Sequence, residues 1–487
     1  MLHNLAYNLT TVNSAYFWDY SRMMPSAKIL TLFTVSLALF MDVLDTNIIN
    51  TAIPAMAKSL SVNPIDLKIA LISYLLCLAI FIPISGWTAD KYGAKRIFIC
   101  AFGVFTASSF WCGYAQTLMD LVIARSVQGV GGAFMISLGR LIVARAFKRH
   151  ELVEAMNTVI IVVSVAVMLG PFVGGFITDH FSWPWIFWIN IPIGILAMIL
   201  AYYCIHDNVP RHTRPFDLPG FVLFGGSLAL MCYSLSAISE STANLNIIVS
   251  LIIISIIMMI TYFIHARHML HPAIQIRLLK IRTFQISVVG NLCARLGFGG
   301  MPFMLPLLQQ VVLGFSAEMS GLLLAPMAFG IVFSKLLASR ILRLVGYKKY
   351  LLGNTILVAL VLWSFQLITP QTSAYMIAVL TFIFGIVLSA QFTGMNSLAY
   401  SDIVEDDLSS STSITSTVQV LGQTFGVAVA AILLRYFSTS GNHDSLTIVT
   451  FHEAFFTMGL LTLFSSFIFI RLKAGDGKQM LGRGEEI

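Results

Sequence analysis

The sequence predicts an all-α polytopic membrane protein with fourteen transmembrane helices. Of its 487 residues, 57% are hydrophobic and only 10% are charged, whereas a soluble domain usually carries about 25% charged residues. Unbroken apolar runs of about twenty residues, the length that a helix needs to cross a bilayer, recur from end to end. Lys and Arg are concentrated in alternate loops between these runs. A membrane β-barrel would instead alternate apolar and polar residues within strands of about ten.

The first group of helices is expected to follow a short cytoplasmic segment, residues 1–28. This segment lacks the apolar stretch and small-residue cleavage site of a secretory signal, so we expect the first apolar run to be a retained helix. Met23 and Met24 precede that run and are alternative start positions to Met1. Six runs make up an N-terminal lobe, residues 29–204, and lie at 29–51, 69–89, 97–116, 119–143, 155–178 and 184–204.

Two longer polar joints, at 205–218 and 267–283, enclose a helix pair with runs at 219–239 and 246–266. We therefore expect an inserted two-helix linker unit at 205–283. A faint repeat relates the two ends of the chain, because Gly93-x-Lys95-Arg96 and Gly346-x-Lys348-Lys349 each follow the second helix of a group of six. The remaining runs form a C-terminal lobe, residues 284–470, before a cytoplasmic tail, 471–487, and lie at 284–310, 318–338, 350–369, 374–398, 412–434 and 451–470.

The positive charges predict the orientation of the chain. With the N-terminus inside, the cytoplasmic loops and termini hold 22 Lys and Arg residues, and the outer loops hold three, Lys58, Lys68 and Arg435. Membrane proteins concentrate Lys and Arg on the cytoplasmic side, so both termini are expected to be cytoplasmic. The same bias accounts for the net charge of +7 without a nucleic-acid partner. All six cysteines lie inside apolar runs, so no disulfide framework or metal site is indicated.

Charged residues inside the spans are the first candidates for function: Asp42, Asp45, Arg125 and Arg295, with Arg140 and Lys335 as further candidates. A charge at this depth costs at least a few kcal/mol unless it is paired or hydrated. Asp42 and Asp45 share one helical face, and two carboxylates this close resist being ionised together, as a proton carrier requires. Helix rise places Asp42 and Arg125 each roughly 9 Å from the outer boundary of the hydrocarbon. We therefore expect these two side chains to meet, either as a structural salt bridge or as part of a transport mechanism.

Arg295 is expected near the bilayer midplane, about 16 Å into the ninth helix. It could bind an anionic group of a substrate, or balance Asp42 and Asp45 across a central cavity. Amides in the spans could supply further hydrogen bonds, although some will only join helices. With Arg295, the predicted cavity residues are Gln128, Gln391, Gln419 and Gln423.

The loop after the second helix holds the most specific motif, G-x3-D-K-x-G-x-K-R. Its residues are Gly86, Asp90, Lys91, Gly93, Lys95 and Arg96. Gly86 permits a close helix approach, Gly93 a tight reversal, and Asp90 can pair with a neighbouring cation or a helix N-terminus. The motif closely resembles the loop signature of the major facilitator superfamily, except that Thr88 replaces the usual Leu. The resemblance implies that the loop governs the equilibrium between inward-facing and outward-facing states.

Further segments resemble the fourteen-helix drug:proton antiporter branch (DHA2 type) of this superfamily, which includes bacterial multidrug resistance proteins. They are the stretch from Leu44 to Pro54, the segment from Trp183 to Gly194, and an antiporter motif with Gly170, Pro171, Gly174 and Gly175. In addition, Arg125-x-x-Gln128-Gly129 is similar to a motif that the superfamily as a whole has in its fourth helix. The resemblance associates the Arg of the fourth helix with proton coupling. Small residues of the antiporter motif also let helices approach and bend. Two six-helix lobes around a midplane site are the architecture of such transporters.

These observations favour a secondary transporter of the bacterial inner membrane that exchanges protons for drugs or other amphiphilic small molecules by alternating access. The resemblance implies function as a monomer, driven by the proton-motive force without a cofactor. One alternative is the transport of an endogenous anionic metabolite, such as a carboxylate siderophore, anchored by Arg295. Another alternative is a non-transporting membrane sensor or scaffold. The chain offers no phosphate-binding loop for ATP and no soluble domain for enzymatic chemistry, so we expect no enzyme activity.

Overall fold

The computed structural model describes residues 25–206, 215–238, 244–269, 272–404, 407–440, 446–473 and 475–477. Fourteen helices in this part of the chain are long and apolar enough to cross a membrane, which confirms the fourteen predicted spans. Most of the expected N-terminal segment, with Met1, Met23 and Met24, and most of the expected tail lie outside the described residues.

The N-terminal lobe is built around α2, which contacts α6, α7 and α9. Its apolar core includes Phe98, Phe102 and Phe105, all fully buried. The second span is interrupted near Pro83, which cannot donate the helical hydrogen bond at that position. The elements are α2 (Pro25–Ser59), α3 (Lys68–Phe81), η2 (Ile82–Ile84), α4 (Ser85–Tyr92), α5 (Ala94–Tyr114), α6 (Leu118–Ala146), α7 (Arg149–His180), α8 (Trp185–Trp188) and α9 (Asn190–Cys204).

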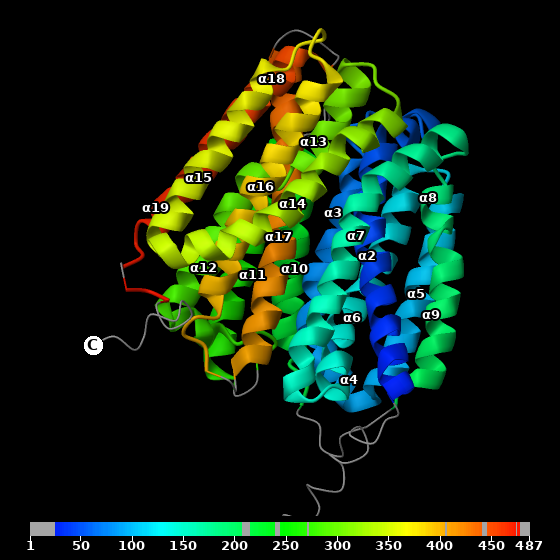
Figure 1. The fold of residues 1–487 in the computed structure, drawn as a ribbon, viewed down its shortest axis with the longest axis vertical. Coiled ribbons are helices and arrows are strands. Elements are labelled where there is room, and N and C mark those ends of the chain that lie inside the picture. The colour runs from blue at the N-terminus through cyan, green and yellow to red at the C-terminus, as the bar shows by residue number, and fades with distance from the viewer. Residues whose placement is uncertain are drawn as a thin grey trace, which may run out of the picture.

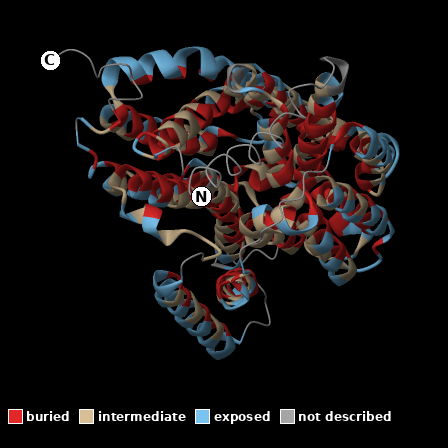
Figure 2. Cartoon of the chain, turned by 90° about the horizontal axis from the view of Figure 1, so that it is seen from below, coloured by how far each residue is buried: buried red, intermediate tan, exposed pale blue. Residues whose placement is uncertain are grey.

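The C-terminal lobe repeats this plan, and the inserted helix pair stands between the two lobes in the chain (Figure 1). Figure 2 shows that buried residues follow the inward faces of the helices and exposed residues the outward faces. The inserted unit contains α10 (Leu218–Ile238), α11 (Leu245–His268) and η3 (Ile276–Lys280). The C-terminal lobe contains α12 (Arg282–Phe298), α13 (Met301–Leu307), η4 (Leu308–Val312), α14 (Ala317–Val345), α15 (Tyr347–Ser364), η5 (Phe365–Leu367), α16 (Ala374–Ala399), α17 (Leu408–Ser440), α18 (Ile448–Phe464) and α19 (Ser466–Phe469).

The inserted pair covers a seam between the lobes. Helix α10 contacts both α3 and α17, and Phe224 and Leu228 pack in one apolar cluster with Ala79 and Leu421. Buried Asp217 fixes the start of α10, because its carboxylate accepts hydrogen bonds from the Gly220 N–H at 2.9 Å and the Ala273 N–H at 3.1 Å. The carboxylate also lies 2.7 Å from His265 Nε2, at the end of α11.

The two lobes are joined directly at the end of the bundle that carries α8 (Figure 1). Here the Asp179 carboxylate, at the end of α7, accepts from the Glu318 N–H at 2.7 Å and the Ala317 N–H at 3.3 Å, at the start of α14. His180 Nε2 lies 2.9 Å from Glu318 Oε2. Carboxylates are stabilised at helix N-termini, so Asp179 ties α14 to α7.

A second set of contacts joins the lobes further toward the α4 end. Arg140 Nη1 on α6 donates to Ser416 Oγ on α17 at 3.0 Å, and α17 packs along α3. The turns that lead into α5 and α15 share one backbone conformation, because Gly93 and Gly346 have φ angles of 93° and 77°. Only glycine adopts this conformation readily, and its recurrence supports the repeat that relates the two lobes.

Candidate functional site

A buried polar cluster in the N-terminal lobe is centred on Asp45. Arg125 Nη1 forms an ion pair with Asp45 Oδ2, and the amides of Gln128 and Asn190 each donate to Asp45 Oδ1 at 2.9 Å. Arg125 Nη1 also donates to Gln128 Oε1 at 2.6 Å. The four side chains come from α2, α6 and α9, and each residue is 0% exposed. The cluster therefore joins three helices through groups that would be costly to bury alone.

Asp42 belongs to the same cluster through an aromatic residue. The Tyr74 hydroxyl, on α3, donates to Asp42 Oδ1, and the Tyr74 ring lies 4.1 Å from the guanidinium carbon of Arg125. Such a contact between a cation and a ring face is attractive and strengthens away from water. One tyrosine thus contacts both the carboxylate of Asp42 and the charge of Arg125.

The structure corrects the expected partner of Arg125. Depth alone predicted Asp42, but the ion pair forms with Asp45, about one helical turn further along α2. Asp42 faces Gly132, about two helical turns further along α6, because a Cβ atom at Gly132 would lie 2.8 Å from Asp42 Oδ1. Arg125 is therefore level with a later part of α2, and Asp45 is the nearer of the two carboxylates.

Gly132 makes room for this arrangement. A Cβ atom at Gly132 would lie 2.8 Å from Asp42 Oδ1 and 2.9 Å from Tyr74 Oη, closer than ordinary contact. The backbone of α6 therefore approaches Asp42 only because position 132 carries no side chain.

Arg295, in the C-terminal lobe, has a different environment. Its Nε donates to Asn291 Oδ1 at 2.8 Å and its Nη1 donates to Gln423 Oε1 at 3.2 Å. The guanidinium carbon lies 4.2 Å from the Phe392 ring, and the residue is 8% exposed. Among the described residues, its hydrogen-bond partners are neutral amides rather than carboxylates. A cation held in this way retains the capacity to bind an anionic or strongly accepting group.

The loop motif agrees with expectation at Asp90 and differs at Gly86. Asp90 Oδ1 pairs with Arg145 Nη2 at 3.1 Å, across α4 and α6, and Lys91 Nζ lies 4.8 Å from the Trp87 ring. The close helix approach expected at Gly86 is wrong for this conformation, since a Cβ atom there would meet nothing within 4 Å. The space beside Gly86 is open because α4 leans on α5 and α6 of its own lobe.

The antiporter motif lies on α7 and contacts both neighbours of that helix. A Cβ atom at Gly170 would lie 2.6 Å from Asn47 Cβ on α2, and Gly174 faces the Ile48 carbonyl on α2. Gly175 faces the Ala317 carbonyl on α14, while Gly321 of α14 faces the Pro171 carbonyl. The motif therefore packs α7 tightly against its own lobe on one side and against the opposite lobe on the other.

Comparison with known proteins identifies the family. The sequence profile of the Major Facilitator Superfamily matches residues 35–427 and 288–483. The chain belongs to the major facilitator superfamily. It is 34% identical over 451 residues to relatives from Escherichia coli and Escherichia fergusonii that carry the name multidrug resistance protein MdtD, with 92% of this chain and 96% of the relative covered. Membership of this superfamily makes the chain a membrane transporter.

Solved structures of the superfamily share the fold at low sequence identity. A D-xylose-proton symporter superposes with a TM-score of 0.67 at 12% identity, covering 92% of this chain and 99% of that chain. The peptide transporter POT, in complex with sulfate, gives 0.69 at 14% identity, covering 92% and 95%. These likenesses confirm the all-α fold of two six-helix lobes.

The predicted cavity glutamines are divided among separate environments. Gln423 contacts Arg295, whereas Gln128 joins the Asp45 cluster. Gln391 bonds Asn354 and Thr355 on α15 at 2.7 and 3.1 Å, so its contacts join two helices within the C-terminal lobe. Gln419 Nε2 donates to Asn396 Oδ1 at 2.7 Å.

Sequence reasoning missed Tyr74 and Asn190, which complete the Asp45 cluster. Both are neutral polar residues inside apolar runs, and their burial at 0% exposure is not visible in hydropathy. Their presence in the spans was the available signal, because a buried hydroxyl or amide requires a partner.

The ion pair between Asp45 and Arg125 predicts strong thermodynamic coupling. Arg125→Gln leaves the Asp45 carboxylate without its cation, which typically costs about 3–5 kcal/mol for a buried pair. The double variant Asp45→Asn with Arg125→Gln removes both charges and should recover most of that loss. Unfolding of the purified variants in detergent, followed by circular dichroism with increasing sodium dodecyl sulfate, measures the coupling. Single-variant losses that simply add in the double variant would contradict the pairing.

Proposed function

We propose that this transporter exports amphiphilic small molecules across the bacterial inner membrane in exchange for protons. The observation that carries the proposal is the buried pair of carboxylates on α2, one bonded by the Tyr74 hydroxyl and the other by Arg125. Proton coupling requires carboxylates at membrane depth that can change protonation state. The name of the MdtD relatives supports multidrug export over the traffic of a single anionic metabolite, and membership of a transporter family disfavours a sensor or scaffold.

The contacts suggest how Asp42, Asp45 and Arg125 would share a proton. While Asp45 is ionised, Arg125 and two amides hold its charge. A proton that reaches Asp45 from outside would release the guanidinium, which would then remain stacked on Tyr74 and lie toward Asp42. Asp42 would carry a proton at the start and release it to the cytoplasmic side as the guanidinium approaches. Asp45 would then pass its own proton to Asp42 and regain Arg125, which restores the starting state. The exchange requires that Arg125 be able to change partners without leaving the cluster.

Alternating access would act on two rocking lobes, residues 29–204 and 284–470, with 205–283 as the linker unit. The direct links between α7 and α14 hold the lobes together at the α8 end. The positive loops support a cytoplasmic position for the α4 end and both termini. The proposed coupling groups, Asp42, Asp45 and Arg125, and the proposed substrate contact, Arg295, come from one chain, so a monomer is sufficient. The proton-motive force would drive the cycle without a cofactor.

Proton coupling is expected to depend on the charged residues of the N-terminal lobe. Asp42→Asn, Asp45→Asn and Arg125→Lys should each lower exchange at least about tenfold, because the first two lose a proton site and Lys lacks the planar fork of Arg. The assay is substrate-induced proton release from everted vesicles, with a fluorescent lipophilic cation as substrate. Glu453→Gln, an exposed carboxylate on α18, is the matched control and should retain exchange. Undiminished exchange in both Asp variants would rule out this coupling site.

The open space at Gly86 provides a test of rocking. In this conformation a side chain at Gly86 meets no neighbour, so Gly86→Leu should leave the thermal stability unchanged. If the loop packs against the opposite lobe when the α4 end closes, the same change should lower the transport rate at least about tenfold. Gly353→Leu is the matched control, because a side chain there also meets nothing within 4 Å and the position carries no proposed role. Equal transport by the two variants would argue against closure at Gly86.

Arg295 is proposed to select among substrates. Because its described partners are neutral amides, it should favour substrates with an anionic or strongly accepting group. Arg295→Gln should therefore raise the KM for an anionic amphiphile about tenfold or more while changing the KM for a lipophilic cation little. Transport of both probes by the same proteoliposomes measures the ratio. An equal loss for both probes would assign Arg295 a structural role instead.

A further inference from the structure

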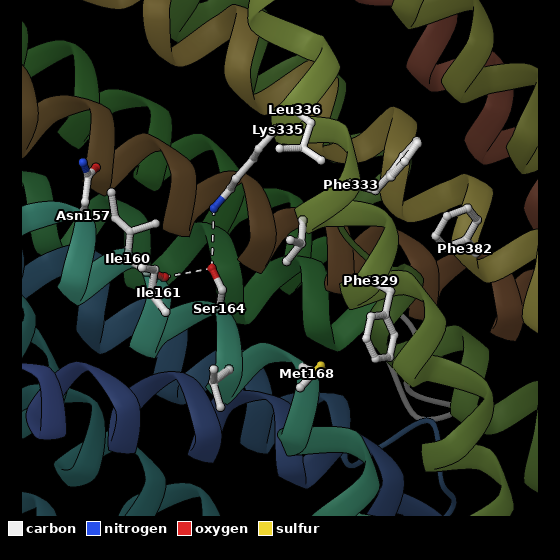
Figure 3. A pocket seen from close by; sticks show the side chains of 12 residues that line it. Asn157, Ile160, Ile161, Ser164, Met168, Phe329, Phe333, Lys335, Leu336 and Phe382 are labelled. Atoms are coloured by element: carbon white, nitrogen blue, oxygen red, sulfur yellow. Dashed lines mark hydrogen bonds between the residues drawn. The ribbon is translucent and has the colours of Figure 1, made fainter.

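An apolar groove of about 870 Å³ lies between α7 and α14, away from the Asp45 cluster. Figure 3 shows the two helices as its walls, with Phe382 of α16 at one side. This volume falls within the range of pockets that hold small organic molecules. Neither the loop motif nor the proposed coupling residues contribute to its lining.

The lining of this groove contains one cation, Lys335, and no carboxylate. Lys335 of α14 points toward Ser164 of α7 (Figure 3), and Lys335 Nζ lies 3.5 Å from Ser164 Oγ. Asn157 is the other polar side chain of the lining, and no Asp or Glu lines the groove. A lysine at membrane depth is costly unless an anion or water compensates its charge. The site is therefore suited to an anionic group.

The groove is open on its outer side. Two lining residues, Ile161 and Leu336, are 64% and 65% exposed, so a molecule can enter the groove from the surface of the protein. Lys335 stands ten residues before Val345, the last residue of α14, which is about 15 Å along the helix. In the structure the side chain lies toward Ser164, deeper in the membrane, and its flexible stem also allows it to extend toward the nearer membrane surface, which is the cytoplasmic one in the proposed orientation.

We propose that the groove binds an anionic phospholipid of the cytoplasmic leaflet. The lipid phosphate would be held by Lys335, extended toward the cytoplasmic surface, with Asn157 as a hydrogen-bond donor. One acyl chain would lie along the apolar wall that includes Val165, Phe329 and Val332. Charge complementarity decides the class of occupant, because a cation beside an apolar trough matches an anionic head on a hydrocarbon chain. Basic pockets between membrane helices bind lipid head groups in this way, and the bilayer supplies this ligand at high concentration.

Native mass spectrometry of the purified full-length protein tests the site. Phosphatidylglycerol is titrated against the wild type, and phosphatidylethanolamine serves as the zwitterionic comparison. Lys335→Gln should weaken phosphatidylglycerol binding about fivefold, the effect of one Lys near an anionic lipid, with little change for phosphatidylethanolamine. Arg340→Gln is the matched control, since Arg340 lies on the same helix outside the lining. Val332→Trp keeps the charge, fills the trough and should also weaken binding.

Three results would overturn the proposal. The first is phosphatidylglycerol binding by Lys335→Gln and Val332→Trp equal to that of the wild type. The second is an equal loss in Lys335→Gln and Arg340→Gln, which would indicate attraction by surface charge alone. The third is unchanged lipid binding with a raised KM for a transported amphiphile in Lys335→Gln, which would make the groove a substrate path. The lipid measurement needs no transport, so it stands or falls separately from the proposed exchange of substrate for protons.

Discussion

The buried ion pair between Asp45 and Arg125 constrains the structure of the N-terminal lobe. Neither charge could stay in this environment alone, and the remaining oxygen of Asp45 is occupied by amides from α6 and α9. Three helices must keep their relative positions for the pair to survive. Gly132 follows from the same constraint, because α6 has to approach α2 closely while Asp42 and Tyr74 bond in the gap. The polar cluster thus determines where small residues are needed.

The two lobes share a fold but compensate their buried cations differently. Arg125 is neutralised by Asp45 within its own lobe, whereas the described partners of Arg295 are the amides of Asn291 and Gln423. Both guanidinium groups are stacked on aromatic rings, at 4.1 Å from Tyr74 and 4.2 Å from Phe392. A repeated architecture therefore carries an internally paired charge in one lobe and a charge with residual binding capacity in the other. This asymmetry is compatible with one lobe handling protons and the other contacting substrate.

Hydropathy and loop charge were sufficient to predict the fourteen spans, because crossing a bilayer imposes a length and composition that are visible in any window of the sequence. The pairing of charges was harder. Depth along a straight helix predicted that Arg125 meets Asp42, but the packing of α2 against α6 sets Gly132 beside Asp42 and Arg125 beside Asp45. Neutral partners such as Tyr74 and Asn190 cannot be recognised from hydropathy or charge, because their role depends on which helices pack against each other. Gly86 is a further example. The sequence predicts a close helix contact at this glycine, but it does not tell in which conformation of the transporter such a contact would form.

The seam between α7 and α14 brings these constraints together. Near the α8 end, Gly175 and Gly321 let the two backbones touch, and Asp179 bonds the start of α14. Further along the same helices the side chains become large, and the seam widens into the groove that holds Lys335. One helix pair is thus tight at one end and parted at the other, which is the geometry expected of a pivot between two lobes. A molecule bound in the groove would oppose any motion that brings α7 and α14 together there. The occupant of the groove would therefore affect how the two lobes move.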